Sequence, residues 1–162
     1  MGEDLSRQLD YAIFTPALQK GYSQFAVKDP STLSRKMPAG LVPADLNFLS
    51  DKSKLFHFPA ALYSVGQFTK AQMESPPSCM VTKRDFDKTL ILGDSGVFQI
   101  LEGKLVVESD DDRERIFNWL VRNTDFAMTL DVPTAKSKTY EQFGECFEKT
   151  KEHLEYLRER FP

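Results

Sequence analysis

Residues 90–100 read LILGDSGVFQI, a short apolar run that ends in a glycine and is followed by an acidic residue and a serine. The apolar letters before Gly93 are consecutive rather than alternating, which is typical of a strand buried on both faces. The Gly-Asp-Ser-Gly core can present either a serine nucleophile or an aspartate at the end of a buried strand. The surrounding sequence must therefore decide whether Ser95, Asp94 or neither residue carries chemistry.

Downstream of this stretch, helix and strand patterns alternate. Residues 109–124 predict a helix, because Ser109 can cap it and the aspartates at 110–112 favour the positive end of its dipole. Its apolar face is expected to contain Ile116, Phe117, Leu120 and Val121. Residues 125–134, DFAMTLDVPT, predict a second buried strand that Pro133 stops.

Residues 137–161 predict a second helix, with Gly144 as its weak point. The residues at helical spacing there are Tyr140, Phe143, Phe147, Leu154, Leu157 and Phe161. The order strand, helix, strand, helix predicts an α/β fold with a parallel sheet. Upstream, residues 1–50 are expected to form an irregular lead-in, because prolines and Gly40 interrupt any long helix.

Length and composition bound the fold. The chain has 162 residues, of which 41% are hydrophobic and 28% are charged, as in ordinary globular domains. It is too short for a complete eight-stranded α/β barrel of about 250 residues. No apolar run reaches the length of a membrane span, and the acidic N-terminus lacks the apolar core of a secretory signal. A cytoplasmic location with no membrane partner is expected.

Charge and cysteine content restrict the function classes. Cys79 and Cys146 are the only cysteines, and no zinc-ligand spacing is present, so both are expected to be buried thiols and no metal site is predicted. The net charge of −3 gives no overall electrostatic footprint for nucleic acid. Any contact with a polynucleotide must therefore be local or supplied by another chain.

A serine protease is the first alternative for Gly-Asp-Ser-Gly, and His57 precedes it in the required order. The motif fails because Val97 and Phe98 follow Gly96, whereas the nucleophile elbow needs glycine at position 97. The flanking α/β pattern is also wrong for two β-barrels. His57 is interpreted as a histidine satisfied among apolar neighbours, and Ser95 is not expected to be a nucleophile.

Asp94 and Asp131 fit a ligand-binding site better than Ser95 fits a protease site. In a parallel α/β sheet, ligands collect at the carboxyl ends of strands, where Asp94 and Asp131 both fall. Gly93 and Gly96 would let the backbone turn sharply and approach a ligand, while Phe98 offers a flat surface for stacking. A planar heterocycle with hydrogen-bond donors is the expected ligand. The alternative is that both aspartates only close loops.

Two segments of the sequence together resemble a known enzyme superfamily. GDSGVFQI at 93–100, followed by DFAMTLDVPT at 125–134, resembles the tRNA-guanine transglycosylase superfamily. The LDVPT ending is similar to the archaeosine-type branch, and Gly93 with the short loop LEGKLVVESD is similar to relatives that insert 7-deazaguanines into DNA. The resemblance covers roughly residues 86–160. Val97 departs from it, because glycine or serine is common at that position.

The resemblance implies base exchange, in which guanine in DNA or tRNA is replaced by a 7-deazaguanine. Asp94 would be the general acid/base that handles the proton of the departing or incoming base. Phe98 would stack on the base, and Asp131 would accept hydrogen bonds from its N–H and NH₂ groups. The pocket would be completed by Ser95, Gly96 and Gln99.

The resemblance also implies a fold, an incomplete (β/α)8 barrel in which residues 51–162 form the first half and residues 1–50 precede it. The nucleophile and the zinc site of the family belong to the second half, so no cofactor is expected in this chain. Half a parallel barrel leaves strand edges unpaired, so a complementary chain or an oligomer is predicted. Two alternatives stay open: a non-catalytic base-binding or scaffolding subunit, and a glycosidase using the two carboxylates.

Overall fold

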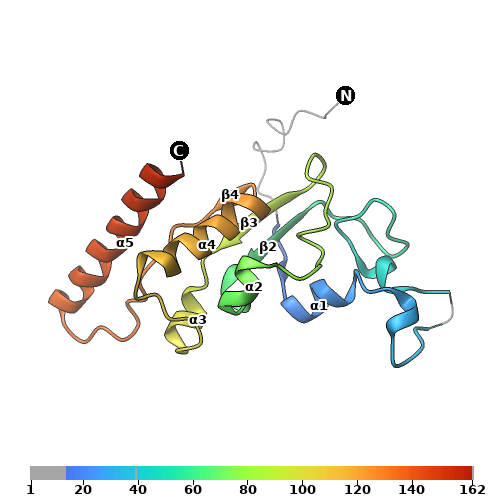
Figure 1. Cartoon of the computed structure of the whole chain (residues 1–162), viewed down its shortest axis with the longest axis horizontal. Helices are drawn as coiled ribbons and strands as arrows, with labels where there is room; N and C mark the ends of the chain where they lie inside the picture. The colour runs from blue at the N-terminus through green and yellow to red at the C-terminus, as the bar shows by residue number, and fades with distance from the viewer. Residues whose placement is uncertain (1–13, 39, 162) are drawn as a thin grey trace. The chain divides into compact units, whose positions relative to one another are not determined.

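A parallel four-stranded sheet with its strands in chain order, β1-β2-β3-β4, organises the computed structural model, which describes residues 14–38 and 40–161 (Figure 1). The strands are β1 (Ala17–Leu18), β2 (Ala60–Ser64), β3 (Leu90–Asp94) and β4 (Phe126–Ala127). Strand β1 pairs with β2 so that Ala17 lies opposite Leu62 and Leu18 opposite Tyr63. The predicted α/β class with a parallel sheet is therefore confirmed.

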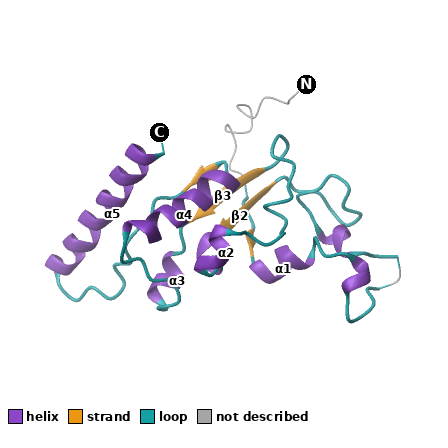
Figure 2. Cartoon of the chain, in the orientation of Figure 1, coloured by secondary structure: helices purple, strands orange, loops and turns teal. Residues whose placement is uncertain are grey.

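Helices connect and follow the strands (Figure 2). The α-helices are α1 (Lys20–Phe25), α2 (Lys70–Glu74), α3 (Val97–Leu101), α4 (Asp110–Asn123) and α5 (Tyr140–Arg160). Three short 3₁₀ helices are η2 (Pro30–Thr32), η3 (Pro43–Leu46) and η4 (Val65–Gln67). Pro30 and Pro43 begin η2 and η3, where a missing N–H costs nothing.

The chain divides into two compact units, one comprising the residues up to Tyr63 with Pro77–Leu92, the other Ser64–Pro76 with Gly93–Pro162. In the first unit, the region expected to be an irregular lead-in contains β1 and α1. The N–H of Met80 donates to both the carbonyl and the hydroxyl of Ser23 at 3.0 Å, which anchors α1 in a buried setting. These tertiary contacts order a segment whose local sequence shows no strong pattern.

Helix α4 begins as predicted, with the Ser109 hydroxyl accepting a hydrogen bond from the Asp112 N–H at 3.3 Å. Ile116, Phe117 and Leu120 are buried, as expected, but Val121 is 53% exposed. At 100° per residue, the buried face of the helix is centred near Ile116 and Leu120, so Val121 lies beyond its margin.

Strand β3 differs from the expectation of burial on both faces. Ile91 and Gly93 are buried, whereas Leu90, Leu92 and Asp94 on the other face are half-buried. A Cβ placed on Gly93 would lie 2.7 Å from the Leu120 side chain, so α4 covers the first face closely. The half-buried face has no comparably close cover.

The predicted second buried strand is also different. Only Phe126 and Ala127 form β4, and both are exposed, while Leu130 beyond them is buried. The N–H of Met128 donates to the carbonyl of Gly93 at 2.8 Å, after which the chain leaves the sheet. Because β4 is the last strand in the sheet order, it has one neighbour, which leaves its residues open to solvent.

Helix α5 forms over the predicted residues and continues through Gly144, with the Thr139 hydroxyl as its cap. No residue of α5 is buried. Phe117 of α4 packs near Tyr156 and Phe161, with ring centroids 6.3 and 6.1 Å away. The aromatic residues of its first two turns, Tyr140, Phe143 and Phe147, are exposed.

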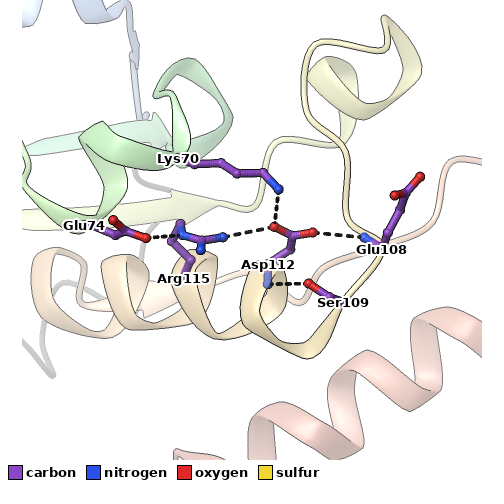
Figure 3. Close-up of polar contacts among 6 residues, drawn as sticks. All are labelled: Lys70, Glu74, Glu108, Ser109, Asp112 and Arg115. Atoms are coloured by element: carbon purple, nitrogen blue, oxygen red, sulfur yellow. Dashed lines mark hydrogen bonds and ion pairs between the residues drawn. The ribbon is translucent and has the colours of Figure 1, made fainter.

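An ion-pair network joins α2 to α4 (Figure 3). The buried carboxylate of Asp112 accepts from Lys70 at 2.5 Å and from Arg115 at 3.0 Å, and Arg115 also donates to Glu74 at 2.7 Å (Figure 3). A third hydrogen bond to Asp112 comes from the Glu108 N–H. The network fixes the segment that contains η4 and α2 against the rest of the second unit.

Two further expectations concern the burial of the cysteines and the presence of membrane-spanning helices. Cys79 is buried, but Cys146 is only half-buried, and its thiol lies 3.7 Å from the hydroxyl of Ser137 in the loop before α5. Among residues 14–38 and 40–161, no helix combines the length and the apolar character needed to cross a membrane.

Candidate functional site

Three strand ends of the second unit supply the candidate site. Ser64 and Gly66 lie at the end of β2, Asp94 to Gln99 follow β3, and Thr129 to Asp131 follow β4. Because the strands are parallel, their carboxyl ends lie along one edge of the sheet, where ligands of open α/β sheets bind. Each predicted site residue lies in one of these segments.

Ser95 connects two of the segments. Its side chain is fully buried, and its hydroxyl donates a hydrogen bond to the carbonyl of Thr129 at 3.0 Å. A buried hydroxyl already donating to a carbonyl cannot attack a substrate, which agrees with the expectation that Ser95 is not a nucleophile. The side chain instead fixes the backbone after β3 beside the backbone that leads to Asp131.

Asp94 is the last residue of β3 and is half-buried. Within the described part of the chain, its carboxylate makes no hydrogen bond and no ion pair. The alternative in which Asp94 only closes a loop requires a bond to nearby backbone N–H groups, and the described residues supply none. Its acceptor oxygens are therefore available to a ligand.

Gly96 gives the loop its shape. It adopts a left-handed conformation with φ of +96° and stands at the N-terminus of α3. A Cβ on Gly96 would lie 2.7 Å from Cα of Gly66, so the two backbones approach too closely for side chains. The positive φ of Gly96 permits the sharp turn, and the close approach to Gly66 requires glycine at both positions.

Gln99 and Phe98 have different surroundings on α3. The Oε1 of Gln99 accepts a hydrogen bond from the Ser64 hydroxyl at 3.4 Å, and a Cβ on Gly66 would collide with it at 2.6 Å. Gln99 thus closes the gap between β2 and β3. Phe98 is 69% exposed, so its ring is open to solvent.

Gly93 has a structural role that the sequence did not indicate. It was expected to let the backbone approach a ligand, but it is buried, and a Cβ on it would lie 2.7 Å from the Leu120 side chain and 2.8 Å from that of Thr124. The glycine is required for the close packing of the strand against the helix.

Asp131 is half-buried and lines a pocket of about 310 Å³ in the second unit. Apolar walls come from Ile100, Val107, Leu130, Val132 and Pro133, and polar groups come from Glu108, Ser109, Arg113, Lys149, Glu152 and His153. In the described structure, this lining includes neither Asp94 nor Phe98. The sequence predicted one pocket shared by the two aspartates, whereas the structure ties their segments together but gives Asp131 a pocket that Asp94 does not line.

His153 of α5 is a half-buried polar residue of that pocket. Burial first, and the nearby positive charge of Arg113 second, lower the pKa of its imidazole. Its Nδ1 atom is buried and has no hydrogen-bond partner in the described structure. Neutral imidazole and the ionised Asp131 carboxylate together offer both a donor and an acceptor to a heterocycle in the pocket.

Two residues of the candidate site, Gly66 and His153, were not predicted from the sequence. Strand β2 was not assigned because Pro59 interrupts its apolar run, so Gly66 was not placed at a strand end. His153 stands in the middle of a charged helical stretch and has no motif around it. Applying the strand-end rule to the sequence YSVGQF at 63–68 would have found Gly66.

Comparisons with known proteins give no assignment: no family model, no curated protein and no solved structure matches this chain. Across residues 14–38 and 40–161, histidine, cysteine, aspartate and glutamate side chains form no group of three or more that could hold a metal ion.

Proposed function

We propose that this chain provides the base-handling part of a base-exchange enzyme that replaces guanine by a 7-deazaguanine in DNA or tRNA. The observation that carries the proposal is the Ser95–Thr129 hydrogen bond, which joins the strand ends bearing Asp94 and Asp131. The proposal includes the fold: the parallel sheet with its intervening helices would be the first half of a (β/α)8 barrel, completed by a complementary chain or segment.

The proposed exchange consists of two successive displacements at C1′ of the nucleoside, with proton transfer by Asp94. A carboxylate nucleophile from the complementary part attacks C1′ of the nucleoside, and the bond between C1′ and the guanine breaks. The protonated form of Asp94 gives its proton to the leaving guanine and then takes a proton from the incoming 7-deazaguanine. The nitrogen of that base bonds to C1′ as the bond between C1′ and the carboxylate nucleophile breaks, which frees the nucleophile. The half-buried carboxylate of Asp94 suits both transfers, because in the described structure no hydrogen bond or ion pair occupies its oxygens.

Base recognition would use Phe98 and Asp131. The exposed ring of Phe98 offers one stacking face, and the two oxygens of an ionised carboxylate match the adjacent N–H and NH₂ donors of a guanine edge. The pocket beside Asp131 combines apolar walls with polar and charged side chains that could orient a ligand. Ser95, Gly96 and Gln99 would shape the loop that holds these groups.

Calorimetric titration with 7-cyano- and 7-aminomethyl-7-deazaguanine tests the proposal. The wild-type chain is expected to bind, Asp131→Ala to lose binding, and Asp87→Ala to retain it as a matched control. Asp87 is an exposed aspartate of the first unit. Equal binding by wild type and Asp131→Ala would contradict the assignment of Asp131.

A second candidate is a non-catalytic base-binding subunit, and the pocket lining favours it. Asp131 has a pocket of its own that Asp94 does not line, so base binding need not involve the acid/base residue. Asp94→Asn separates the two candidates in exchange assays with the reconstituted enzyme. Loss of exchange with base binding intact supports the catalytic role, whereas unchanged exchange supports the binding subunit.

A further inference from the structure

A second pocket, of about 270 Å³, lies in the first unit and is formed by two loops, residues 47–57 and 83–88. Its basic lining residues are Lys52, His57, Lys83, Arg84 and Lys88, and its acidic ones are Asp51 and Asp85. With histidine neutral, four cations against two carboxylates give a local charge of +2 in a chain of net charge −3. The pocket is therefore a local basic site on an acidic protein.

Its carboxylates are already engaged. Lys88 pairs with Asp51 of the other loop at 3.2 Å and with Asp85 at 3.6 Å, which fastens the two loops together. Lys52 and Lys83 are exposed, and no carboxylate in the described residues pairs with either ammonium group. These two side chains are free to contact an anion.

The two loops that form the pocket also bear exposed aromatic rings. Phe56 is 55% exposed and stacks on Phe48, with ring centroids 5.4 Å apart and planes at 15°. Phe86 is 50% exposed, and the guanidinium of Arg84 lies 4.1 Å from its ring centroid. Arg84 is held in place by hydrogen bonds of 3.0 Å to the carbonyl and hydroxyl of Thr89.

His57 does not fit its sequence interpretation. It was expected to be satisfied among apolar neighbours, but its side chain is exposed and lines this pocket beside Lys52 and Asp51. The apolar residues next to it in sequence, Leu55 and Phe56, are also exposed. The stretch LFH therefore presents apolar and basic groups to solvent together instead of contributing to the core.

We infer that this pocket binds a phosphodiester group of a single-stranded polynucleotide, with Lys52 and Lys83 contacting the phosphate. The exposed rings of Phe56 and Phe86 would receive neighbouring bases, because single-strand sites combine basic grooves with aromatic stacking platforms. The choice of a polynucleotide rests on the proposed function, whereas the anion site stands on its own residues.

Fluorescence anisotropy with labelled oligo-dT and oligo-rU of about 12 nucleotides tests the inference across a salt series. The double variant Lys52→Ala/Lys83→Ala is compared with Lys28→Ala/Lys36→Ala, which removes two exposed lysines of the same unit outside the pocket. Both variants change the net charge equally. The pocket variant is expected to bind about tenfold more weakly at low salt, with a salt slope smaller by about 0.7, the value for one phosphate contact on a single strand.

The arginine variant Lys52→Arg/Lys83→Arg should restore binding. Equal weakening by both alanine variants would overturn the site, since only net charge would then matter, and so would absence of binding by the wild type. Competition by inorganic phosphate at concentrations matching the oligonucleotide would show a free-anion site instead, and equal binding of polyglutamate would show a site for acidic protein. Either result overturns the polynucleotide assignment.

Titration with 7-deazaguanine keeps this inference separate from the proposed function. The Lys52→Ala/Lys83→Ala variant is expected to bind the base like the wild type, and Asp131→Ala to bind the oligonucleotide like the wild type. If 7-deazaguanine does not bind while oligonucleotide binding persists and depends on Lys52 and Lys83, the proposed function alone is rejected. The reverse result would reject the phosphate site alone.

Discussion

The hydroxyl of Ser95 donates a hydrogen bond of 3.0 Å to the carbonyl of Thr129, and this bond spans two strand ends that are 34 residues apart in sequence. Ser95 is fully buried and Thr129 is half-buried, so the bond is partly shielded from water. Shielded hydrogen bonds are costly to break, because the partner left behind cannot be solvated. The bond makes the position of the Asp131 segment depend on the loop after β3.

Ser95→Ala should lower the free energy of unfolding by about 1–2 kcal/mol, because it leaves the Thr129 carbonyl without its donor. Urea denaturation measures the change. Ser34→Ala, at an exposed serine of the first unit, should change stability by less than about 0.5 kcal/mol. Comparable values for the two variants would show that the bond contributes nothing to the fold.

Gly96→Ala should destabilise the protein by more than about 2 kcal/mol, because it combines a left-handed backbone with a contact of 2.7 Å to the Gly66 Cα. Gly103→Ala is the matched control, since Gly103 has φ of +71° but no heavy atom within 4 Å of the new Cβ. Its cost should be about 1 kcal/mol, the conformational part alone. Thermal unfolding of both variants separates the conformational cost from the steric cost. Equal unfolding midpoints for the two variants would show that the contact with Gly66 contributes no steric cost.

Helices α4 and α5 could be predicted because their signals are local. Ser109 and Thr139 stand at their caps, and apolar residues repeat at helical spacing within each segment. The exposure of Val121 was not predictable in this way, since the width of the buried face depends on the neighbouring elements. The parallel sheet followed from the alternation of elements.

The strands were harder to predict, because their extent depends on partners distant in sequence. Strand β2 was missed at Pro59, yet a proline just before a strand is permitted, and its carbonyl accepts from the Leu90 N–H at 2.7 Å. Strand β4 was predicted too long because an apolar run does not reveal an edge position. The contact between Gly66 and Gly96 could not be foreseen without β2.

Gly144→Ala should raise the free energy of unfolding by about 0.5–1 kcal/mol, because alanine favours the helix and its Cβ meets nothing within 4 Å. The glycine was expected to be a weak point of the helix, and α5 continues through it. Gly93→Ala is the contrasting control, with contacts of 2.7–2.8 Å to Leu120 and Thr124 that should make it destabilising. A loss of stability in Gly144→Ala would indicate an obstruction at that position.

Asp112 predicts a pH dependence of stability at acid pH. The hydrogen bond from Lys70 first, with further hydrogen bonds from the backbone N–H of Glu108 and from Ser109, lowers the pKa of its carboxyl to about 2. An unfolded aspartate titrates near 3.9, so the folded state holds the ionised form more strongly. The resulting stabilisation is fully present above about pH 4 and is lost as the pH falls towards 2.

Urea denaturation between pH 6 and pH 2 measures this contribution, which should be about 1–2 kcal/mol once the solvent exposure of Lys70 is allowed for. Asp112→Asn should be less stable than the wild type at pH 6, and the difference should shrink towards pH 2. Asp111→Asn is the matched control, because Asp111 occupies the same helical turn but is exposed. A stability difference between wild type and Asp112→Asn that stayed constant over this range would show that the ion pairs with Lys70 and Arg115 do not set the acid stability of the second unit.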